Sequence, residues 1–439
     1  MSDAKQDILQ ALNIADSFTL AMDEEIRQDG LAGSLCGFGL ELDQTPDITK
    51  LQQRIDKFGQ QFPVALASLQ QRGKRFYWCK REEVVPTLFF QHHCPDKQSE
   101  QTFQKDTVNR LINEKQDREL ISPIEFHLII SPSQTTFFFR WIHPFCDARG
   151  IDLILKYLCA EDTTPFQQND SKPLVNQQLD KYSWWKKLTL LIKAKRYILS
   201  IDELVSIQPF KSKKAPQQLN YNILKLSESQ TEQVTKIARK KVGLTGTSLY
   251  YIGCFMRALD KLNPDHEGDA YCSPYAFNLR KQRALTPMIA NHVCALFAQA
   301  PRAIVQDRDK LFAHLKQQNM DVIRQQLDYA FLPLMWAGSW LSLDKYGKVL
   351  RLSKTKQERS SFWFSDVGKL DIPQQSFPGA EITSLFHLCQ VTTPPGLAFL
   401  CCIYQNQLIL SYNFVEPMLN PEKIEQLHQL VLAELLDDN

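Results

Sequence analysis

The stretch Trp141-Ile142-His143-Pro144-Phe145-Cys146-Asp147-Ala148-Arg149-Gly150 follows an apolar run and precedes a segment with helical spacing. The pattern predicts a strand over 135–142, a turn, and a helix over 151–158. A histidine in that turn can leave the sheet edge and project into a cleft, where its near-neutral pKa suits a general base. An aspartate four residues later can fix the loop by binding an arginine or a backbone amide. A lone histidine beside aromatic residues is also typical of a packed core, so the residue types alone leave both interpretations open.

The first half of the chain alternates strand and helix patterns. Residues 125–130 and 135–142 favour two strands, and the turn residues 131–134 between them predict a hairpin. Residues 47–62 predict a helix, because apolar side chains recur there at helical spacing until Pro63.

The second half begins after a basic, proline-containing seam at 181–219. Beyond it we expect helices over 229–242 and 248–262, the second capped by Thr247 or Ser248. Apolar strands are expected at 397–404 and 407–414, and a last helix follows Pro421. The sequence therefore predicts a mixed α/β (α+β) architecture in two domains, 1–180 and 220–439, joined by the segment 181–219.

Composition excludes several classes of protein. The 439 residues carry 51 Lys and Arg against 49 Asp and Glu, a net charge of only +2, so no nucleic-acid partner is expected. The N-terminus resembles no signal peptide, and the longest apolar runs are too short to span a bilayer. The 11 cysteines include no C-x-x-C pair, which favours reduced thiols in a cytoplasmic protein.

The common catalytic signatures are missing from the sequence. Gly37-Phe38-Gly39 lacks the third glycine of a dinucleotide fingerprint, and Gly73-Lys74 lacks the upstream glycine of a phosphate loop. There is no G-x-S-x-G nucleophile elbow and no H-E-x-x-H zinc helix. We therefore expect no metal, no P-loop and no covalent serine chemistry.

The decapeptide resembles the second half of the HHxxxDG motif of the chloramphenicol acetyltransferase-like and condensation-domain superfamily. Its wider context is similar to the bacterial wax ester synthase/diacylglycerol acyltransferase branch, and the likeness extends over some 350 residues. The other matching segments, in chain order, are Ala15 to Asp23, Leu51 to Arg72, Ile121 to Phe126, Ser273 to Arg280 (similar to "PVNLR"), Asn291-His292-Val293 (similar to "GN") and Phe364 to Lys369 (similar to S-N-x-G).

The chain departs from this pattern at five positions. Ile142 and Ala148 replace the first histidine and the glycine of HHxxxDG, with Gly150 left to supply flexibility to the loop. Asp366 replaces the asparagine of S-N-x-G, and Thr247-Ser248 stand where the family commonly has Asn-Asp. These departures keep a non-catalytic member of the fold open as an alternative.

The resemblance implies two similar domains forming a V, with an active-site tunnel between them. It implies that His143 is the general base, that Asp147 is structural and pairs with Arg280, and that Asn278, Asn291 and Ser365 are candidates for lining the tunnel. It implies no cofactor, because the acyl thioester is the substrate. The expected reaction is O-acyl transfer from acyl-CoA to an alcohol, with no acyl-enzyme. The open alternatives are a condensation-type enzyme that uses an acyl-carrier protein and a non-catalytic binding protein.

Three further segments carry charge or histidines outside the motif. His92-His93 is expected to be structural or exposed, although His92 and Asp96 share the HxxxD spacing. The amphipathic segment 184–199 could touch a membrane at its surface, but packing at the domain seam is favoured. The basic run 345–359 is expected to be a solvated loop, with phosphate or carrier-protein binding as the alternative.

Overall fold

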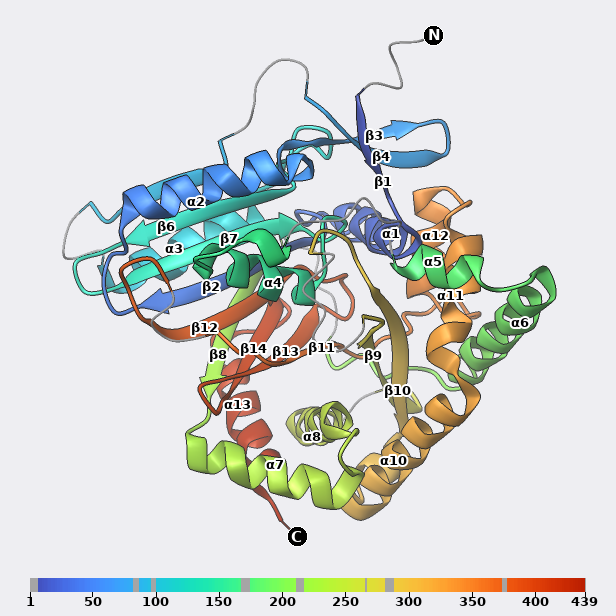
Figure 1. Cartoon of the computed structure of the whole chain (residues 1–439). Coiled ribbons are helices and arrows are strands. Elements are labelled where there is room, and N and C mark those ends of the chain that lie inside the picture. Colours follow the sequence, from blue (N-terminus) through green and yellow to red (C-terminus); the bar gives the residue numbers. More distant parts are fainter. Residues whose placement is uncertain are drawn as a thin grey trace.

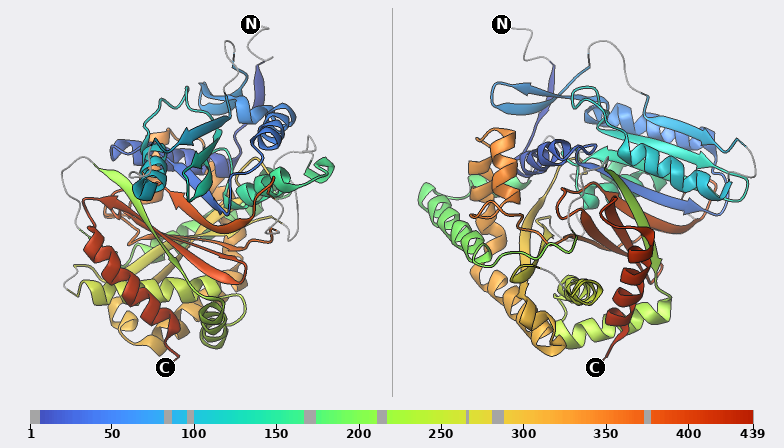
Figure 2. Two further views of the ribbon diagram at one scale, coloured as in Figure 1. Left: turned by 90° about the vertical axis from the view of Figure 1, so that its left-hand side faces the viewer. Right: turned by 180° about the vertical axis from the view of Figure 1, so that it is seen from behind.

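The computed structural model describes residues 7–81, 87–95, 100–166, 174–210, 217–264, 267–280, 288–372 and 377–438. Within these ranges the strands form three sheets, and helices cover them (Figure 1). Figure 2 shows the same arrangement from the side and from behind.

A five-stranded sheet carries the strand that leads into the His143 turn. Its order is β12 (Ile382–Cys389), β2 (Leu35–Leu42), β7 (Thr135–Ile142), β6 (Ile124–Ile130) and β5 (Phe89–His93). β7 is buried along its whole length and pairs antiparallel with both β2 and β6, so the predicted hairpin is confirmed. Helix α3 (Glu100–Asn113) packs against β2, β6 and β7.

Strand β12 joins the two halves of the chain. It belongs to the second half in sequence, yet it pairs antiparallel with β2 from Ile382 opposite Leu42 to Cys389 opposite Cys36. The predicted first domain, 1–180, therefore shares its sheet with a strand from 220–439. One continuous cluster of buried apolar side chains also extends across both halves.

A six-stranded sheet forms the other half. Its order is β10 (Val293–Pro301), β9 (Ala270–Asn278), β11 (Trp363–Lys369), β13 (Leu397–Tyr404), β14 (Gln407–Glu416) and β8 (Gln218–Lys225). The predicted hairpin of β13 and β14 is confirmed. Its two turn residues, Gln405 and Asn406, both have left-handed φ angles, 48° and 59°, which match the right-handed twist of such hairpins. A small third sheet has the order β1 (Ile8–Ala11), β4 (Arg75–Cys79), β3 (Ser68–Arg72).

The remaining helices follow largely from local patterns. They are α1 (Ile14–Gln28), α2 (Ile48–Gln61), α4 (Ala148–Cys159), α5 (Leu174–Asp180), α6 (Trp184–Ile201), α7 (Glu228–Val242), α8 (Thr247–Leu262), α9 (Arg302–Val305), α10 (Arg308–Gln325), α11 (Leu327–Gly338), α12 (Leu343–Arg351) and α13 (Pro421–Leu436), with 3-10 turns at Pro63–Leu66 and Thr164–Phe166. The expected cap of α8 is wrong: Gly246 occupies the cap position and offers no side chain, while Thr247 already lies inside the helix.

The expectation of a solvated basic loop at 345–359 is wrong for its two arginines that lie in the interior. Arg351 is buried and pairs with Glu358 at 2.6 Å and with Asp29 at 3.0 Å. Arg359 is buried as well and pairs with Asp202 at 2.8 Å. Glu358 lies within the segment, part of which is helix α12, and Asp29 and Asp202 are remote in the sequence but fold against it. These carboxylates neutralise the two arginines, which are therefore not available to hold a phosphate.

Candidate active site

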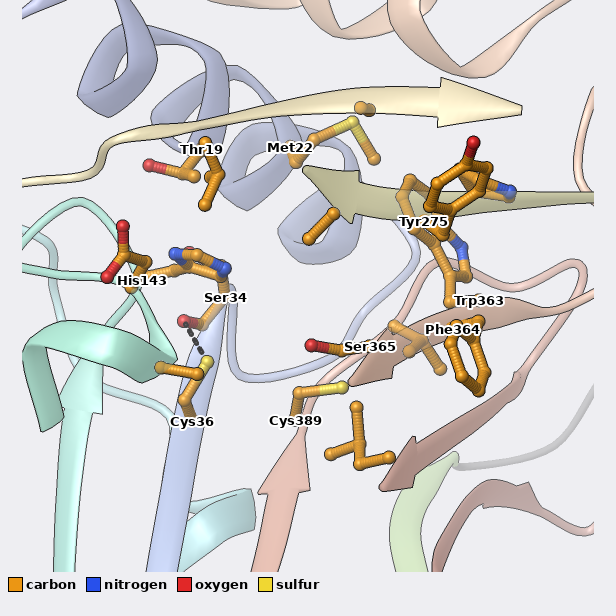
Figure 3. Close-up of a pocket in the computed structure, with 18 of the residues that line it drawn as sticks. Thr19, Met22, Ser34, Cys36, His143, Tyr275, Trp363, Phe364, Ser365 and Cys389 are labelled. Atoms are coloured by element: carbon orange, nitrogen blue, oxygen red, sulfur yellow. Dashed lines mark hydrogen bonds between the residues drawn. The ribbon is translucent and has the colours of Figure 1, made fainter. Parts of the chain in front are cut away.

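A cavity of about 270 Å³ lies between the two halves of the molecule. The first half contributes side chains from α1, β2 and the loop after β7, and the second half contributes side chains from β9, β10, β11 and β12. Figure 3 shows His143 and Ser34 on one side and Tyr275, Trp363 and Phe364 on the other. A cavity walled by both halves agrees with the tunnel that the motifs imply.

His143 directly follows β7, and its main chain is held on both sides. Its N–H donates to the carbonyl of Ser34 at 2.9 Å, and its own carbonyl accepts from Asn291 Nδ2 at 2.8 Å. The imidazole points into the cavity (Figure 3). Burial lowers the pKa of His143 below its ordinary 6.5, and this effect outweighs the attraction of Asp147. The side chain is therefore neutral at pH 7 and able to accept a proton.

Asp147 is fully engaged in holding the loop. Its carboxylate accepts two bonds from Arg280 Nη1, at 2.6 and 2.8 Å, and one from the backbone N–H of His292 at 2.8 Å. It also caps α4 by accepting from the Gly150 N–H at 2.9 Å. Burial alone would raise the pKa of Asp147, but the Arg280 charge and these hydrogen bonds hold it below its usual value. The carboxylate is a structural anchor with no capacity left for proton transfer.

The Asp147–Arg280 ion pair links the first half to the second. Both side chains are nearly inaccessible, and Arg280 Nη2 also donates to the carbonyl of Ala290 at 3.0 Å. The pair expected from the resemblance is thus present, at a distance of 2.6 Å. Removing either partner would leave an uncompensated charge in the interior.

The local departures from the motif fit the structure. Ile142 ends β7 as a buried residue opposite Leu35. Ala148 is the first residue of α4, where the capping Asp147 already sets the turn. Gly150 is buried within the first turn of α4. It serves close packing, because a Cβ atom would come within 2.4 Å of the Met288 carbonyl oxygen.

Two of the three predicted tunnel-lining residues line the cavity. Asn278 and Ser365 do so, and Ser365 is directed into the cavity in Figure 3. Asn291 does not, and that expectation is corrected: it is fully buried and donates to His143 and to Asp16 Oδ1. Its side chain holds the His143 loop against the start of α1.

Two residues that depart from the family pattern in the second half, Ser248 and Asp366, are in contact. Ser248 Oγ donates to Asp366 Oδ2 at 2.7 Å, and Asp366 Oδ1 accepts from the Gly368 N–H at 2.9 Å. Burial raises the pKa of Asp366 above its usual value. The carboxyl group thus supplies acceptors to the turn at Gly368, and the hydroxyl of Ser248 supplies a donor to that carboxyl.

Two polar groups at the site were not assigned a role from sequence. Asp16 accepts from the backbone and side chain of Asn291, and burial raises its pKa to about 7. Asp16 lies in the segment Ala15 to Asp23, which resembles the family's opening, and this resemblance was the one signal in the sequence that pointed to it. His387 lines the cavity from β12, stacked on Trp141, and burial lowers its pKa to about 3. No local pattern marks His387, because its position depends on the pairing of β12 with β2.

The second HxxxD-spaced histidine lies elsewhere. His92 is on β5, and its Nε2 lies 3.1 Å from Nδ1 of His127, which in turn approaches Glu125 at 3.3 Å. Asp96, the aspartate that shares its spacing, lies outside the described residues. His92 is not among the residues that line the cavity. Over the described ranges, no three His, Cys, Asp or Glu side chains group in a way that could hold a metal ion.

Comparison with known proteins gives structural matches only. No family model matches the sequence, and no curated protein matches it. Trichothecene 15-O-acetyltransferase from Fusarium sporotrichioides is 11% identical over 96% of this chain and 94% of its own, with a TM-score of 0.69. Polyketide synthase associated protein 5 from Mycobacterium tuberculosis is 13% identical over 97% and 98%, with a TM-score of 0.66.

A further match is the first condensation domain of the calcium-dependent antibiotic synthetase, solved with a substrate analogue. It is 8% identical over 98% of this chain and 97% of its own, with a TM-score of 0.72. At such identities the likeness shows the fold. This chain has the mixed α/β, two-domain fold of condensation domains and chloramphenicol acetyltransferase-like acyltransferases.

Proposed function

We propose that the chain transfers an acyl group from a thioester to an acceptor, with His143 as general base. The observation that carries this is a neutral imidazole that faces a cavity shared by both halves and has its main chain fixed by Ser34 and Asn291. His143 takes the proton of the acceptor hydroxyl as its oxygen attacks the thioester carbonyl. The new C–O bond forms, the C–S bond breaks, and the proton passes to the departing thiolate.

Ser365 can assist the same step. Its hydroxyl makes no hydrogen bond within the described part of the chain and is directed into the cavity. It is therefore free to donate to the carbonyl oxygen while negative charge develops there. The absence of a nucleophile elbow in the sequence agrees with direct transfer, without an acyl-enzyme.

The first candidate reaction is ester formation from acyl-CoA and an alcohol, of the wax ester synthase/diacylglycerol acyltransferase kind. The apolar side chains of Met22, Tyr275 and Phe364 suit an acyl chain. The cavity has a volume of about 270 Å³ and is lined mainly by apolar side chains, as expected of a site that holds a small apolar group. The second candidate uses a carrier-protein thioester and an amine or alcohol, and the likeness to a condensation domain favours it.

A thiol-release assay separates these candidates. The purified chain is mixed with acetyl-, butyryl-, octanoyl- or palmitoyl-CoA and a panel of alcohols, and then with the same acyl groups on a carrier protein. Alcohol-dependent release from CoA donors is the expected result. Release from the carrier protein alone would move the assignment to the condensation reaction. No thiol release from either kind of donor would contradict the proposal and indicate a non-catalytic binding protein.

A further inference from the structure

Helix α6 has apolar side chains on two opposite sides. Leu190, Ala194 and Ile201 are buried, and α6 packs against α11. A second apolar set is exposed, and these side chains fall within a sector about 100° wide on the opposite side of the helix. This set, here called the outer face, consists of Trp184 (65% exposed), Trp185 (75%), Leu188 (38%), Ile192 (42%) and Leu199 (41%).

The outer face is left uncovered by the part of the chain that the structure describes. α6 lies at the right-hand edge in Figure 1 and at the left-hand edge when the molecule is seen from behind in Figure 2. Packing at the domain seam, the interpretation favoured from sequence, is therefore wrong for these five side chains. An exposed apolar set that includes two neighbouring tryptophans marks an interaction surface.

The charge on α6 indicates what this surface meets. The helix contains five cationic residues and no carboxylate, whereas the whole chain has a net charge of only +2. Lys195 and Arg196 are both exposed; Lys195 lies within the sector of the outer face, and Arg196 lies at its border. The cations of α6 are Lys186, Lys187, Lys193, Lys195 and Arg196. A second copy of this chain docking through the same face would bring like charges together, which disfavours a homodimer here.

We propose that α6 docks on an anionic lipid surface, with its outer face among the headgroups and upper acyl chains. Tryptophan side chains favour that depth because their rings are amphipathic, and lysine and arginine contact lipid phosphates. None of the helices in the described ranges has the length and apolarity to cross a bilayer. α6 therefore lies along the surface, and the binding is reversible.

Vesicle flotation tests this docking without any substrate, so its outcome is independent of the proposed acyl transfer. The full chain is floated with phosphatidylcholine vesicles, with and without about a third of phosphatidylglycerol. We expect binding only to the anionic vesicles, and a loss of binding at high salt. Addition of anionic vesicles should also shift the tryptophan emission to shorter wavelength.

Two matched pairs of variants localise the contact. Trp184→Ser with Trp185→Ser should lower the partition coefficient at least about tenfold, whereas Leu244→Ser, at a side chain 80% exposed elsewhere, should leave it unchanged. Lys195→Glu with Arg196→Glu should lower it at least about twentyfold, whereas Lys236→Glu with Arg239→Glu on α7 should cost far less. All the changed side chains are exposed, so each variant should melt at the wild-type temperature.

Several outcomes would overturn the proposal. The first is that the chain does not float with anionic vesicles, and the second is that it floats equally well with neutral vesicles. The third is that the charge reversals on α6 and on α7 weaken binding equally. A wild-type dimer that dissociates in the Trp184→Ser, Trp185→Ser variant without lipid would assign the outer face to a second copy instead.

Discussion

Two histidines in this chain stand four residues before an aspartate, and their surroundings differ. His143 enters a cavity with its carbonyl and N–H both bonded, and its aspartate is locked by Arg280. His92 lies on β5, outside that cavity, and its ring meets a second imidazole, that of His127. Burial, followed by the charges of His127 and Arg110, lowers the pKa of His92 to about 4.

The supporting residues, rather than the HxxxD spacing, therefore distinguish the two histidines. Both rings are neutral at pH 7, so protonation alone does not distinguish them. What distinguishes His143 is a buried ion pair and the Asn291 bridge, which join the two halves around it. The predictions below test whether that support carries the activity.

The largest difference between the two histidines is expected in the rate of thiol release when each imidazole is removed. His143→Ala should lower the rate of thiol release by about 10²–10⁴-fold, because the general base is lost. His92→Ala should change it by less than about twofold, because that ring is remote from the cavity. Steady-state thiol release, with melting curves as the folding control, measures both. Equal losses in the two variants would remove the distinction between the sites.

Breaking the buried Asp147–Arg280 ion pair should greatly lower the stability of the fold. Arg280→Ala leaves the Asp147 carboxylate buried and uncompensated, which should lower the free energy of unfolding by about 3–5 kcal/mol. Arg110→Ala is the matched change beside His92. That arginine is exposed and lies 3.5 Å from the ring, so its loss should cost no more than about 0.5 kcal/mol. Urea unfolding of both variants measures the difference, and a mild effect of Arg280→Ala would contradict an anchoring role.

The Asn291 bridge should matter for both stability and rate. Asn291→Ala leaves the His143 carbonyl without its buried donor and removes one of the donors to Asp16, at a cost of about 1–3 kcal/mol. Because the bridge positions His143 without lining the cavity, kcat should fall while KM changes little. A rise in KM at constant kcat would instead place Asn291 in contact with substrate.

The pH dependence follows from the direction of the shift at His143. Burial lowers its pKa below 6.5, so the free base persists to lower pH than in an ordinary histidine. The acid limb of kcat/KM should therefore be centred below pH 6.5, with a fall of about tenfold per unit below the lowered pKa. His92→Phe should leave this profile unchanged. An acid limb centred above 6.5 would show that another group titrates.

The smallest effect is expected where the motif glycine is missing. Ala148 is the first residue of α4, and Asp147 already caps that helix. Ala148→Gly should therefore lower the free energy of unfolding by no more than about 1 kcal/mol, and it should leave thiol release unchanged. A several-fold gain in rate would mean that Ala148 limits the loop.

Local patterns predicted most of the elements. The hairpin of β6 and β7, the hairpin of β13 and β14, and helix α2 followed from apolar periodicity and turn residues. The contribution of β12 could not be predicted in this way, because its partner β2 lies about 340 residues earlier in the chain. The same reason hid His387, which reaches the cavity through that pairing.

The site was predicted in part, and the resemblance supplied most of it. The Asp147–Arg280 pair joins residues 133 positions apart, which no spacing rule connects. Long-range partners also explain the errors. Arg351 and Arg359 look solvated in sequence but are paired in the interior, and Asn291 bonds to Asp16 instead of facing the cavity.

Chemical rescue tests the role of His143 most directly. In His143→Gly the missing ring leaves space beside the acceptor, which free imidazole can occupy as a base. We expect thiol release by this variant to be nearly absent and to be restored in proportion to added imidazole, with no such response in His92→Gly. Release at the wild-type rate by His143→Gly without imidazole would contradict the assignment of His143 as the general base.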